Sequence, residues 1–304
     1  MSKDVLIRLE DVKKYFEFKD GFATQYVKAV DGITLDIFKG ETLGLVGESG
    51  CGKSTLGRTI LRLYDKAEGT VEYLGQDVWK ANSKDMLKLR RDMQIVFQDP
   101  LASLNPRKTI YQIIEEPLCF HGYKNKAERK EMVEAIMKAV GLDPAVGNRY
   151  PHEFSGGQQQ RVGIARALIL RPQFIVCDEA VSALDVSVQA QILNLLQKLK
   201  EEYQLTYLFI SHNLSVIKHV CDRIVVMYLG NVVENHALGI TDALHEAAPL
   251  VDQRGSELGG VDFAGGHGHE LMTRTGEGIR HQLFGIIDQT HRGDGEHSQV
   301  GTHQ

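Results

Sequence analysis

The chain has 304 residues, of which 42% are hydrophobic and 25% are charged, and its formal net charge is −5 at pH 7. This length allows one large domain or two small ones with a substantial core, and the composition is that of a globular protein. The net charge argues against nucleic acid as the main partner, and no window approaches 18 uninterrupted apolar residues, so no transmembrane helix is predicted. The N-terminus runs into a strand-like segment without a signal peptide, so we expect the protein to stay in the cytoplasm.

Strands and helices are predicted to alternate along the first 230 residues. The first predicted strands cover residues 5–12, 33–37, 42–46, 70–73 and 94–97, and a helix is predicted over 53–63. From about residue 100 to 170, apolar residues recur three and four apart, which predicts an inserted helical subdomain. Its helices are expected at 110–119, 126–140 and 157–170. Strands at 174–177, 206–210 and 223–227 then alternate with helices at 187–203 and 214–219. The alternation predicts an α/β fold whose mostly parallel sheet is covered on both faces.

A glycine-rich loop lies between the predicted strand 42–46 and the predicted helix 53–63. Its sequence is Gly47-Glu48-Ser49-Gly50-Cys51-Gly52-Lys53-Ser54-Thr55, which matches the phosphate-loop pattern G-x-x-x-x-G-K-[ST]. The glycines let backbone N–H groups turn toward a β-phosphate, and the helix N-terminus adds the positive end of its dipole. We expect Lys53 to reach the β- and γ-phosphates and the Ser54 hydroxyl to bind Mg²⁺. The alternative, a chance glycine-rich turn with a surface lysine, is disfavoured by the flanking strand and helix.

Cys51 is interpreted as a small filler residue of this loop. The four cysteines of the chain show no paired spacing, which argues against a disulfide framework or a metal knuckle. We therefore expect the cysteines to be buried or incidental thiols.

Two adjacent carboxylates, Asp178 and Glu179, end the apolar segment 174–177. Because that strand is predicted to be buried on both sides, the pair should emerge at the carboxyl edge of the sheet, where ligands bind in open α/β folds. In phosphate-loop enzymes an aspartate at this place orients Mg²⁺ and its waters. Glu179 can accept a proton from the attacking water. The alternative interpretation is a solvated strand edge.

A second loop of small residues precedes the predicted helix at 157–170. Its sequence is Phe154-Ser155-Gly156-Gly157-Gln158-Gln159-Gln160-Arg161. This loop forms another helix N-terminus of the kind that binds anions. One nucleotide site has little use for two such loops, so we predict a dimer in which Ser155–Gln158 closes over the nucleotide held by another subunit. The segment resembles the signature motif of ATP-binding cassette (ABC) ATPases.

Further motifs of ABC ATPases follow in the order of the family. Tyr15 resembles the aromatic residue that stacks on adenine, and Gln98 resembles the Q-loop glutamine, which senses Mg²⁺ and the lytic water. The segment 182–185, which ends in Asp185, resembles the D-loop. His212 resembles the switch histidine that contacts the γ-phosphate.

The resemblance covers about residues 4–234. It implies a P-loop NTPase core of the ABC type, with an inserted helical subdomain and an N-terminal antiparallel β region. It implies ATP and Mg²⁺ as cofactors, with Ser54, Gln98 and Asp178 placed near the metal. The residues that it implies for catalysis are Lys53, Gln98, Glu179 and His212.

Finer features are similar to the ATPase subunits of bacterial oligopeptide and dipeptide importers. They lie in the segments 29–32, 40–42, 98–107 and 182–191. The resemblance implies a complex of two such ATPases, identical or different, with two transmembrane permease subunits and an extracytoplasmic peptide-binding protein. The segment after Gln98 would contact the membrane subunit, which places the chain on the cytoplasmic face of the cell membrane. Oligopeptide, dipeptide and nickel import stay open, because specificity resides in the other subunits.

The composition changes abruptly near Asn235. Residues 235–304 contain no lysine, eight of the 12 histidines and many glycines, and they show no sustained period. We interpret them as a poorly ordered tail after an ABC domain at 1–234. A metal site at His267 and His269 is one alternative. A coding frame lost near Asn235 is another, since the break follows directly on an unbroken family match.

Two other functions compete with peptide import. The chain could be a soluble ABC ATPase without a membrane partner, although such proteins usually carry two cassettes or a long coiled-coil insertion, and neither is present in this sequence. It could also be a transport-deficient ATPase whose tail is frame-shifted. Both alternatives retain ATP binding at the phosphate loop.

Overall fold

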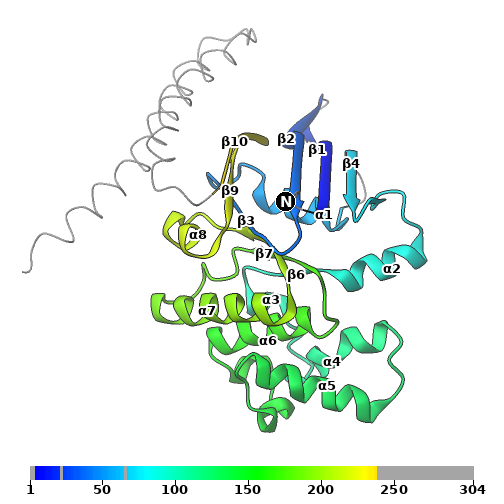
Figure 1. Cartoon of the computed structure of the whole chain (residues 1–304), viewed down its shortest axis with the longest axis vertical. Coiled ribbons are helices and arrows are strands. Elements are labelled where there is room, and N and C mark those ends of the chain that lie inside the picture. Colours follow the sequence, from blue (N-terminus) through cyan, green and yellow to red (C-terminus); the bar gives the residue numbers. More distant parts are fainter. Residues whose placement is uncertain (1–3, 21–22, 65–66, 238–304) are drawn as a thin grey trace, which may run out of the picture. The chain divides into compact units, whose positions relative to one another are not determined.

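A six-stranded sheet with strand order β10-β9-β3-β8-β7-β6 forms the centre of the computed structural model, which describes residues 4–20, 23–64 and 67–237 (Figure 1). Its strands are β3 (Thr42–Gly47), β6 (Met93–Val96), β7 (Phe174–Asp178), β8 (Thr206–Ile210), β9 (Arg223–Tyr228) and β10 (Asn231–Ala237). All neighbouring pairs are parallel except β9 and β10. Every residue of β7 and β8 is buried, because their continuous apolar sequence suits strands covered on both faces.

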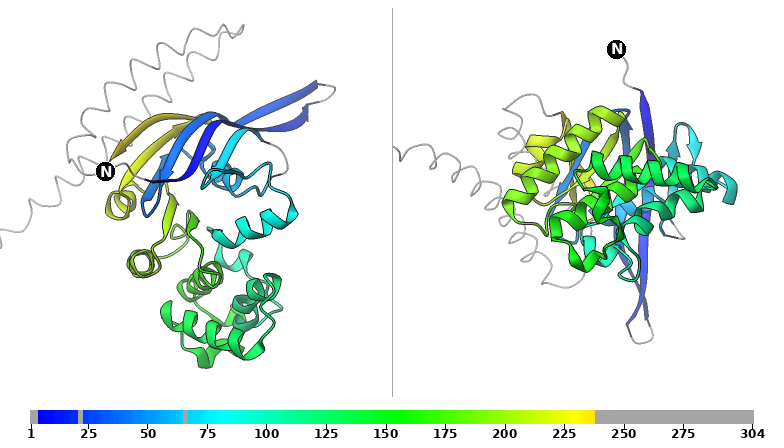
Figure 2. Two further views of the ribbon diagram at one scale, coloured as in Figure 1. Left: turned by 45° about the vertical axis from the view of Figure 1, so that its right-hand side comes forward. Right: turned by 90° about the horizontal axis from the view of Figure 1, so that it is seen from below.

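A second sheet is antiparallel, with strand order β2-β1-β4-β5. Its strands are β1 (Val5–Asp20), β2 (Ala23–Phe38), β4 (Glu68–Tyr73) and β5 (Gln76–Asp77). This sheet confirms the predicted antiparallel β region, but β1 and β2 are longer than the expected strands 5–12 and 33–37. They pair from Val5 with Phe38 to Asp20 with Ala23 and form the long hairpin visible in Figure 2. Cross-strand pairing, which local alternation does not reveal, explains the extra length.

Helices follow the strands along the chain. They are α1 (Lys53–Ile60), α2 (Ser83–Asp92), α3 (Pro100–Ser103), α4 (Ile110–Phe120), α5 (Lys126–Ala139), η1 (Pro144–Asn148), η2 (Pro151–Glu153), α6 (Gly156–Leu168), α7 (Val186–Tyr203) and α8 (Leu214–Val220). Helices α4, α5 and α6 gather on the side of the central sheet away from β1, β2 and β4 (Figure 1). The helical block predicted over residues 100–170 thus consists of α3 to α6 with two 3₁₀ turns.

One helix is shorter than the sequence predicts, and one helix is additional to the prediction. The helix expected over residues 53–63 ends at Ile60, because Arg62 has φ 51°, a left-handed conformation that cannot continue it. Helix α2 was not predicted. Its start has a clear local cause, since the Asn82 side chain accepts hydrogen bonds from the backbone N–H groups of Lys84 and Asp85.

The buried apolar side chains form two clusters that meet at the central sheet. One includes Leu9 and Ile37 of the antiparallel sheet and Leu56 of α1. The other includes Ile113 of α4 and Leu196 of α7. The sheet is therefore held on one face by α1 and the antiparallel strands and on the other by the helical block.

The predicted tail begins inside the last strand. Residues Asn235 to Ala237 belong to β10, where they pair with Arg223 to Val225 of β9. Residues 238–304, with the histidines 267 and 269, lie outside the described residues, so the predictions of a poorly ordered tail, a metal site and a lost frame stay predictions. Within the described ranges, no helix has the length and apolarity needed to cross a bilayer.

Candidate functional site

The predicted site residues that follow β3, β6, β7 and β8 lie at the carboxyl edge of the central sheet. In the strand register, Leu45 of β3 and Asp178 of β7 both pair with Ile210 of β8, and Val96 of β6 pairs with Cys177. The segments that leave these strands therefore start side by side. They carry the phosphate loop after β3, Gln98 after β6, Glu179 after β7 and His212 after β8.

The phosphate loop is closed around the ammonium group of Lys53. This group donates hydrogen bonds to the carbonyl oxygens of Gly47 at 2.8 Å and Glu48 at 2.7 Å, and Lys53 is only 5% exposed. Glu48, Ser49 and Gly50 are exposed at the rim of the loop. A lysine held by backbone carbonyls keeps a positive charge at the loop centre, where a phosphate oxygen can replace a carbonyl partner.

Two loop glycines are required by close backbone contacts. A Cβ atom at Gly52, which has φ 106°, would lie 1.9 Å from the carbonyl oxygen of Ala29. A Cβ atom at Gly47, with φ 149°, would lie 2.2 Å from the carbonyl oxygen of Met227. The predicted role of Cys51 fits its place, since it is 5% exposed and packs with Leu56 in the core cluster. The glycines thus allow the loop to press against β2 and β9.

Asp178 connects the end of β7 to the first two turns of α1. Its carboxylate is 1% exposed and accepts hydrogen bonds from the Ser54 hydroxyl at 2.5 Å and from the Arg58 guanidinium at 3.0 Å. Thr55, the last residue of the loop motif, accepts a bond at its carbonyl oxygen from the Thr59 hydroxyl at 2.7 Å. A serine hydroxyl and a carboxylate in contact are oxygen ligands of the kind that Mg²⁺ prefers.

Glu179 and His212 face each other across the ends of β7 and β8. The His212 Nδ1 atom lies 3.6 Å from the Glu179 carboxylate, whose side chain is 18% exposed, while the His212 side chain is 61% exposed. The backbone N–H of Glu179 donates to the Ile210 carbonyl oxygen at 3.1 Å. The sheet therefore fixes the backbone of the largely buried Glu179, while the His212 side chain is open to solvent.

Gln98 and Asp185 lie on exposed segments at the margin of this edge. Gln98 follows β6, and the carbonyl oxygen of its neighbour Phe97 accepts a bond from the Gln160 side chain of α6 at 3.5 Å. Asp185 caps α7 and accepts bonds from the Ser187 hydroxyl at 2.8 Å and the Val188 N–H at 3.1 Å. The hydrogen bond from the Ser187 hydroxyl is the main cause that lowers the pKa of Asp185, and the bond from the Val188 N–H is the second.

Tyr15 lies on the antiparallel sheet, opposite Lys28 in the β1–β2 register. Its hydroxyl donates a short hydrogen bond to the Asp31 carboxylate, and the Lys28 ammonium lies 5.3 Å from the ring centroid. The bond to Asp31, with partial burial, raises the pKa of Tyr15 to about 12. The ring is half-buried. It is therefore held in one place while keeping part of its surface accessible.

The Ser155–Gln158 segment lies at the start of α6, whereas the phosphate loop leads into α1. Ser155, Gly156 and Gln158 are exposed at the start of α6, where the Ser155 N–H donates to the Gln158 side chain at 3.0 Å. A Cβ atom at Gly157 would lie 2.4 Å from the Cγ1 atom of Val188 in α7. These contacts hold the segment against α7 and leave its polar groups facing outward.

Two residues near the site were missed by the sequence prediction. Arg58 lies four residues after Ser54 in α1, and this spacing is a signal that could have placed it on the same helix face. Asp31 had no comparable local signal, because its partner Tyr15 is 16 residues away. Among the described residues, no group of three or more His, Cys, Asp or Glu side chains could hold a metal ion.

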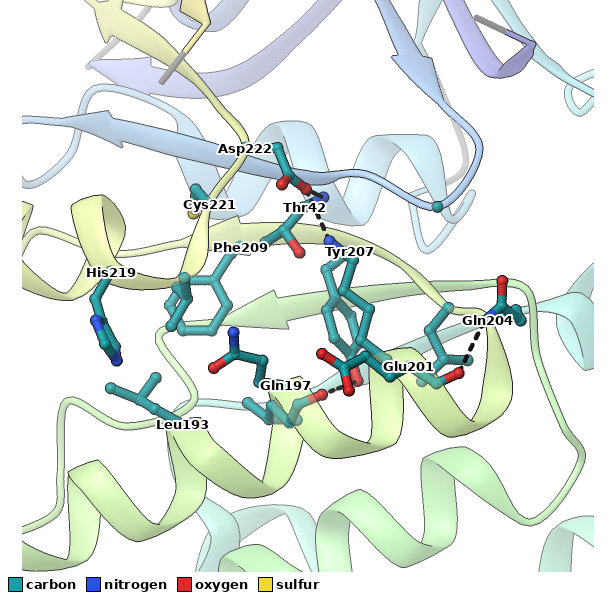
Figure 3. Close-up of a pocket in the computed structure, with 15 residues that line it drawn as sticks. Thr42, Leu193, Gln197, Glu201, Gln204, Tyr207, Phe209, His219, Cys221 and Asp222 are labelled. Atoms are coloured by element: carbon teal, nitrogen blue, oxygen red, sulfur yellow. Dashed lines mark hydrogen bonds and ion pairs between the residues drawn. The ribbon is translucent and has the colours of Figure 1, made fainter. Parts of the chain in front are cut away.

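A cavity of about 390 Å³ lies at the opposite, amino edge of the parallel strands (Figure 3). It is lined by the starts of β3 and β8, by α7 and by the segment before β9. Its polar groups bond to one another, since Lys200 pairs with Asp222 at 2.8 Å and the Tyr207 hydroxyl donates to the Leu196 carbonyl oxygen at 3.2 Å. None of the predicted site residues lines it, so the candidate site is the carboxyl edge.

The chain resembles known proteins in sequence. Residues 30–182 match the family model described as ABC transporter. The chain is 52% identical over 268 residues to the oligopeptide transport ATP-binding protein AppF of Bacillus subtilis (strain 168), covering 84% of this chain and 82% of that protein. It is 51% identical over 266 residues to the oligopeptide transport ATP-binding protein OppF of Escherichia coli (strain K12), covering 83% and 80%.

Solved structures share the fold. The ATP-binding cassette MJ0796, whose structure is described as a dimeric post-hydrolysis state bound to ADP and Pi, aligns with a TM-score of 0.67 and 33% identity, over 77% of this chain and 99% of that one. The cbiO1 protein of Clostridium perfringens, described as part of the ABC transporter complex cbiONQ, aligns with a TM-score of 0.68 and 26% identity, over 84% and 98%.

Proposed function

Because the chain belongs to the ABC transporter family, we propose that it is the ATP-hydrolysing motor subunit of an importer for oligopeptides. The observation that carries the proposal is the convergence of Lys53, Glu179 and His212 on one edge of the sheet. The oligopeptide substrate is supported by relatives that are named oligopeptide transport ATP-binding proteins.

ATP binds at the phosphate loop in this proposal. The loop N–H groups and the N-terminus of α1 receive the β- and γ-phosphates, and Lys53 turns its ammonium group from the carbonyl oxygens of Gly47 and Glu48 to phosphate oxygens. The adenine base stacks on Tyr15. Since Lys53 is already aligned along the loop, it needs only a small movement to reach the nucleotide.

The oxygen ligands Ser54 and Asp178 fit Mg²⁺, which commonly binds through one or two carboxylates and substrate phosphates. Gln98 supplies a further oxygen from the end of β6. When bound, the ion neutralises charge that develops on the phosphates. Arg58 holds the second oxygen of Asp178, so the carboxylate keeps one oxygen directed at Ser54.

Hydrolysis uses Glu179 as the general base. Its carboxylate takes a proton from water as the water oxygen bonds to the γ-phosphorus and the bond to the ADP oxygen breaks. His212, 3.6 Å from that carboxylate, contacts the γ-phosphate. The low exposure of Glu179 limits competing solvent, which favours a water held between carboxylate and phosphate.

The complete site includes a second subunit. The Ser155–Gln158 segment is exposed at the start of α6, so it is available to the nucleotide held by a partner ATPase. Asp185, on the exposed turn before α7, would lie at the same contact. The related cassette MJ0796 is described as dimeric, which supports this arrangement. The partner is a second copy of this chain or a related ATPase subunit.

Two permease subunits and an extracytoplasmic peptide-binding protein complete the proposed importer. The segment after Gln98, which contains α3, contacts a permease and holds the ATPase at the cytoplasmic face of the cell membrane. Closure of the two ATPases would then move the permeases, and hydrolysis would reset them. The exposed side chain of Leu101 in α3 offers apolar surface for that contact.

Peptide uptake tests the proposal. The full chain is expressed, with its permeases and binding protein, in a strain that lacks its own oligopeptide ATPases. We expect ATP-dependent uptake of a labelled oligopeptide, and loss of uptake in the Lys53→Ala control. ATP hydrolysis by the wild-type chain without uptake would contradict the transport function and favour a soluble or transport-deficient ATPase.

A further inference from the structure

The predicted base-binding tyrosine is held by two charged side chains of β2. The Tyr15 hydroxyl donates to one oxygen of the Asp31 carboxylate, and the Lys28 ammonium lies 3.3 Å from the other oxygen. Asp31 is itself partly buried, with a side chain 24% exposed. The Tyr15 hydroxyl is the largest cause that lowers the pKa of Asp31, so this carboxylate stays ionised and able to accept the bond at neutral pH.

The backbone of Asp31 is tied to the phosphate loop through a single intermediate residue. The Asp31 N–H donates to the carbonyl oxygen of Gly230 at 2.9 Å, and the Gly230 N–H donates to the carbonyl oxygen of Cys51 at 3.0 Å. Gly230 lies between β9 and β10. A chain of hydrogen bonds therefore runs from the phosphate loop through Gly230 and Asp31 to Tyr15.

Close backbone packing fixes the same junction. Gly230 has φ 82°, and a Cβ atom there would lie 2.8 Å from the carbonyl oxygen of Lys28. The neighbouring Ala29 carbonyl oxygen blocks a Cβ atom at Gly52 in the loop. The backbone of β2 is therefore packed directly against both the β9–β10 turn and the phosphate loop.

We propose that Asp31 is a positioning residue that fixes the base-binding ring of Tyr15 at a set distance from the phosphate loop. The inference rests on the proposed function, since it concerns the nucleotide of that site. Asp31 touches the tyrosine and not the nucleotide. Asp31 therefore contributes to the binding of the adenine base and not to that of the phosphates, which are held by the loop and Lys53.

Binding measurements with and without a base test this role. The full chain is loaded with a fluorescent ATP analogue, which is displaced by ATP or by inorganic tripolyphosphate. In Asp31→Ala we expect the ATP affinity to fall about fivefold, the effect of one lost hydrogen bond, and the tripolyphosphate affinity to stay unchanged. Tyr15→Phe, which removes the same bond, should give the same pattern. The double variant should lose no more than either single variant.

Two further variants separate positioning from general stability. Asp31→Asn keeps an oxygen that accepts from the Tyr15 hydroxyl, so it should restore most of the ATP affinity. Asp36→Ala is the matched control, since Asp36 is another β2 carboxylate whose charged partner is Arg8 at 2.9 Å, away from Tyr15. It should bind both competitors as the wild type does.

Several results would overturn the inference. Equal weakening of ATP and tripolyphosphate in Asp31→Ala would show a general structural role, and unchanged ATP affinity would show no role. Either result can occur in a chain that hydrolyses ATP and imports peptide, so it would leave the proposed function standing. A wild-type chain that binds ATP no more tightly than tripolyphosphate would instead contradict base binding at Tyr15.

Discussion

At the residue scale, Glu179 has φ 50°, a left-handed conformation that is uncommon for a residue with a side chain. Hydrogen bonds on both sides of the residue hold it there. Its N–H donates to the Ile210 carbonyl oxygen, and its own carbonyl oxygen accepts from the N–H and the hydroxyl of Ser182. Such backbone strain is found at functional sites when the surroundings over-determine it. Here it turns the carboxylate that follows Asp178 toward His212.

The proposed base can be tested by Glu179→Gln. This change keeps the size of the side chain and removes its ability to take a proton. We expect ATP binding to be retained and the hydrolysis rate to fall by at least about 100-fold, the usual contribution of general-base catalysis. Steady-state phosphate release and equilibrium ATP binding measure the two effects. Glu201→Gln, on exposed α7 surface at the opposite edge, is the control. Near-normal turnover in Glu179→Gln would refute the assigned base.

At the element scale, helices α6 and α7 meet at their N-termini, and a glycine in α6 permits the contact. The Cβ atom of an alanine at Gly157 would lie 2.4 Å from Val188, a stiff branched side chain. The exposed residues Ser155 and Gln158 are thereby held in place by α7. This packing connects the signature-like segment to the turn that carries Asp185.

Two alanine substitutions in α6 should have opposite effects on stability. We expect Gly157→Ala to lower the free energy of unfolding by about 1–3 kcal/mol through overpacking. Gly163→Ala should raise it by up to about 1 kcal/mol, because a Cβ atom at Gly163 meets nothing within 4 Å and alanine favours the helix. Thermal unfolding of the full chain measures both. Adding Val188→Ala should restore the stability of Gly157→Ala, and a failure to do so would contradict the proposed contact.

At the scale of the whole molecule, the phosphate loop lies before α1 and the Ser155–Gln158 segment lies at the start of α6. If the phosphate loop of one chain and the Ser155–Gln158 segment of another bind the same nucleotide, the nucleotide site is formed by two chains. Most oligomers of a single chain are symmetric, so two such sites would form at one interface. Hydrolysis would then depend on pairing and not on the single chain.

Mixing two inactive variants tests the shared site. Lys53→Ala removes the loop lysine from both sites of a dimer, and Ser155→Arg blocks both signature segments. In a mixed dimer, the loop of one chain meets the intact Ser155–Gln158 segment of the other. We expect ATP hydrolysis by the mixture to exceed that of either variant alone. If the mixture stays inactive, two copies of this chain do not share a site, and a related ATPase must supply the partner segment.

The elements of the fold were predictable where the signal was local. The apolar runs of β7 and β8 and the spacing in α4 to α7 follow from neighbouring residues, and the structure confirms these elements with shifts of a few residues. The length of β1 and β2 was not predictable, because it depends on pairing between strands. Helix α2 was missed although Asn82 provides a cap and Met86 and Leu89 form its buried face.

The phosphate loop, the Asp178 and Glu179 pair and the family resemblance are readable from the sequence, because each motif is a set of residue types at fixed short spacing. The folded chain is needed to see that Arg58 binds Asp178, and that Asp31 and Gly230 join Tyr15 to the phosphate loop. The first contact joins α1 to β7, and the others join β1, β2, the β9–β10 turn and the loop after β3. Chain segments so far apart carry no common period or spacing, so their meeting depends on sheet register and backbone packing.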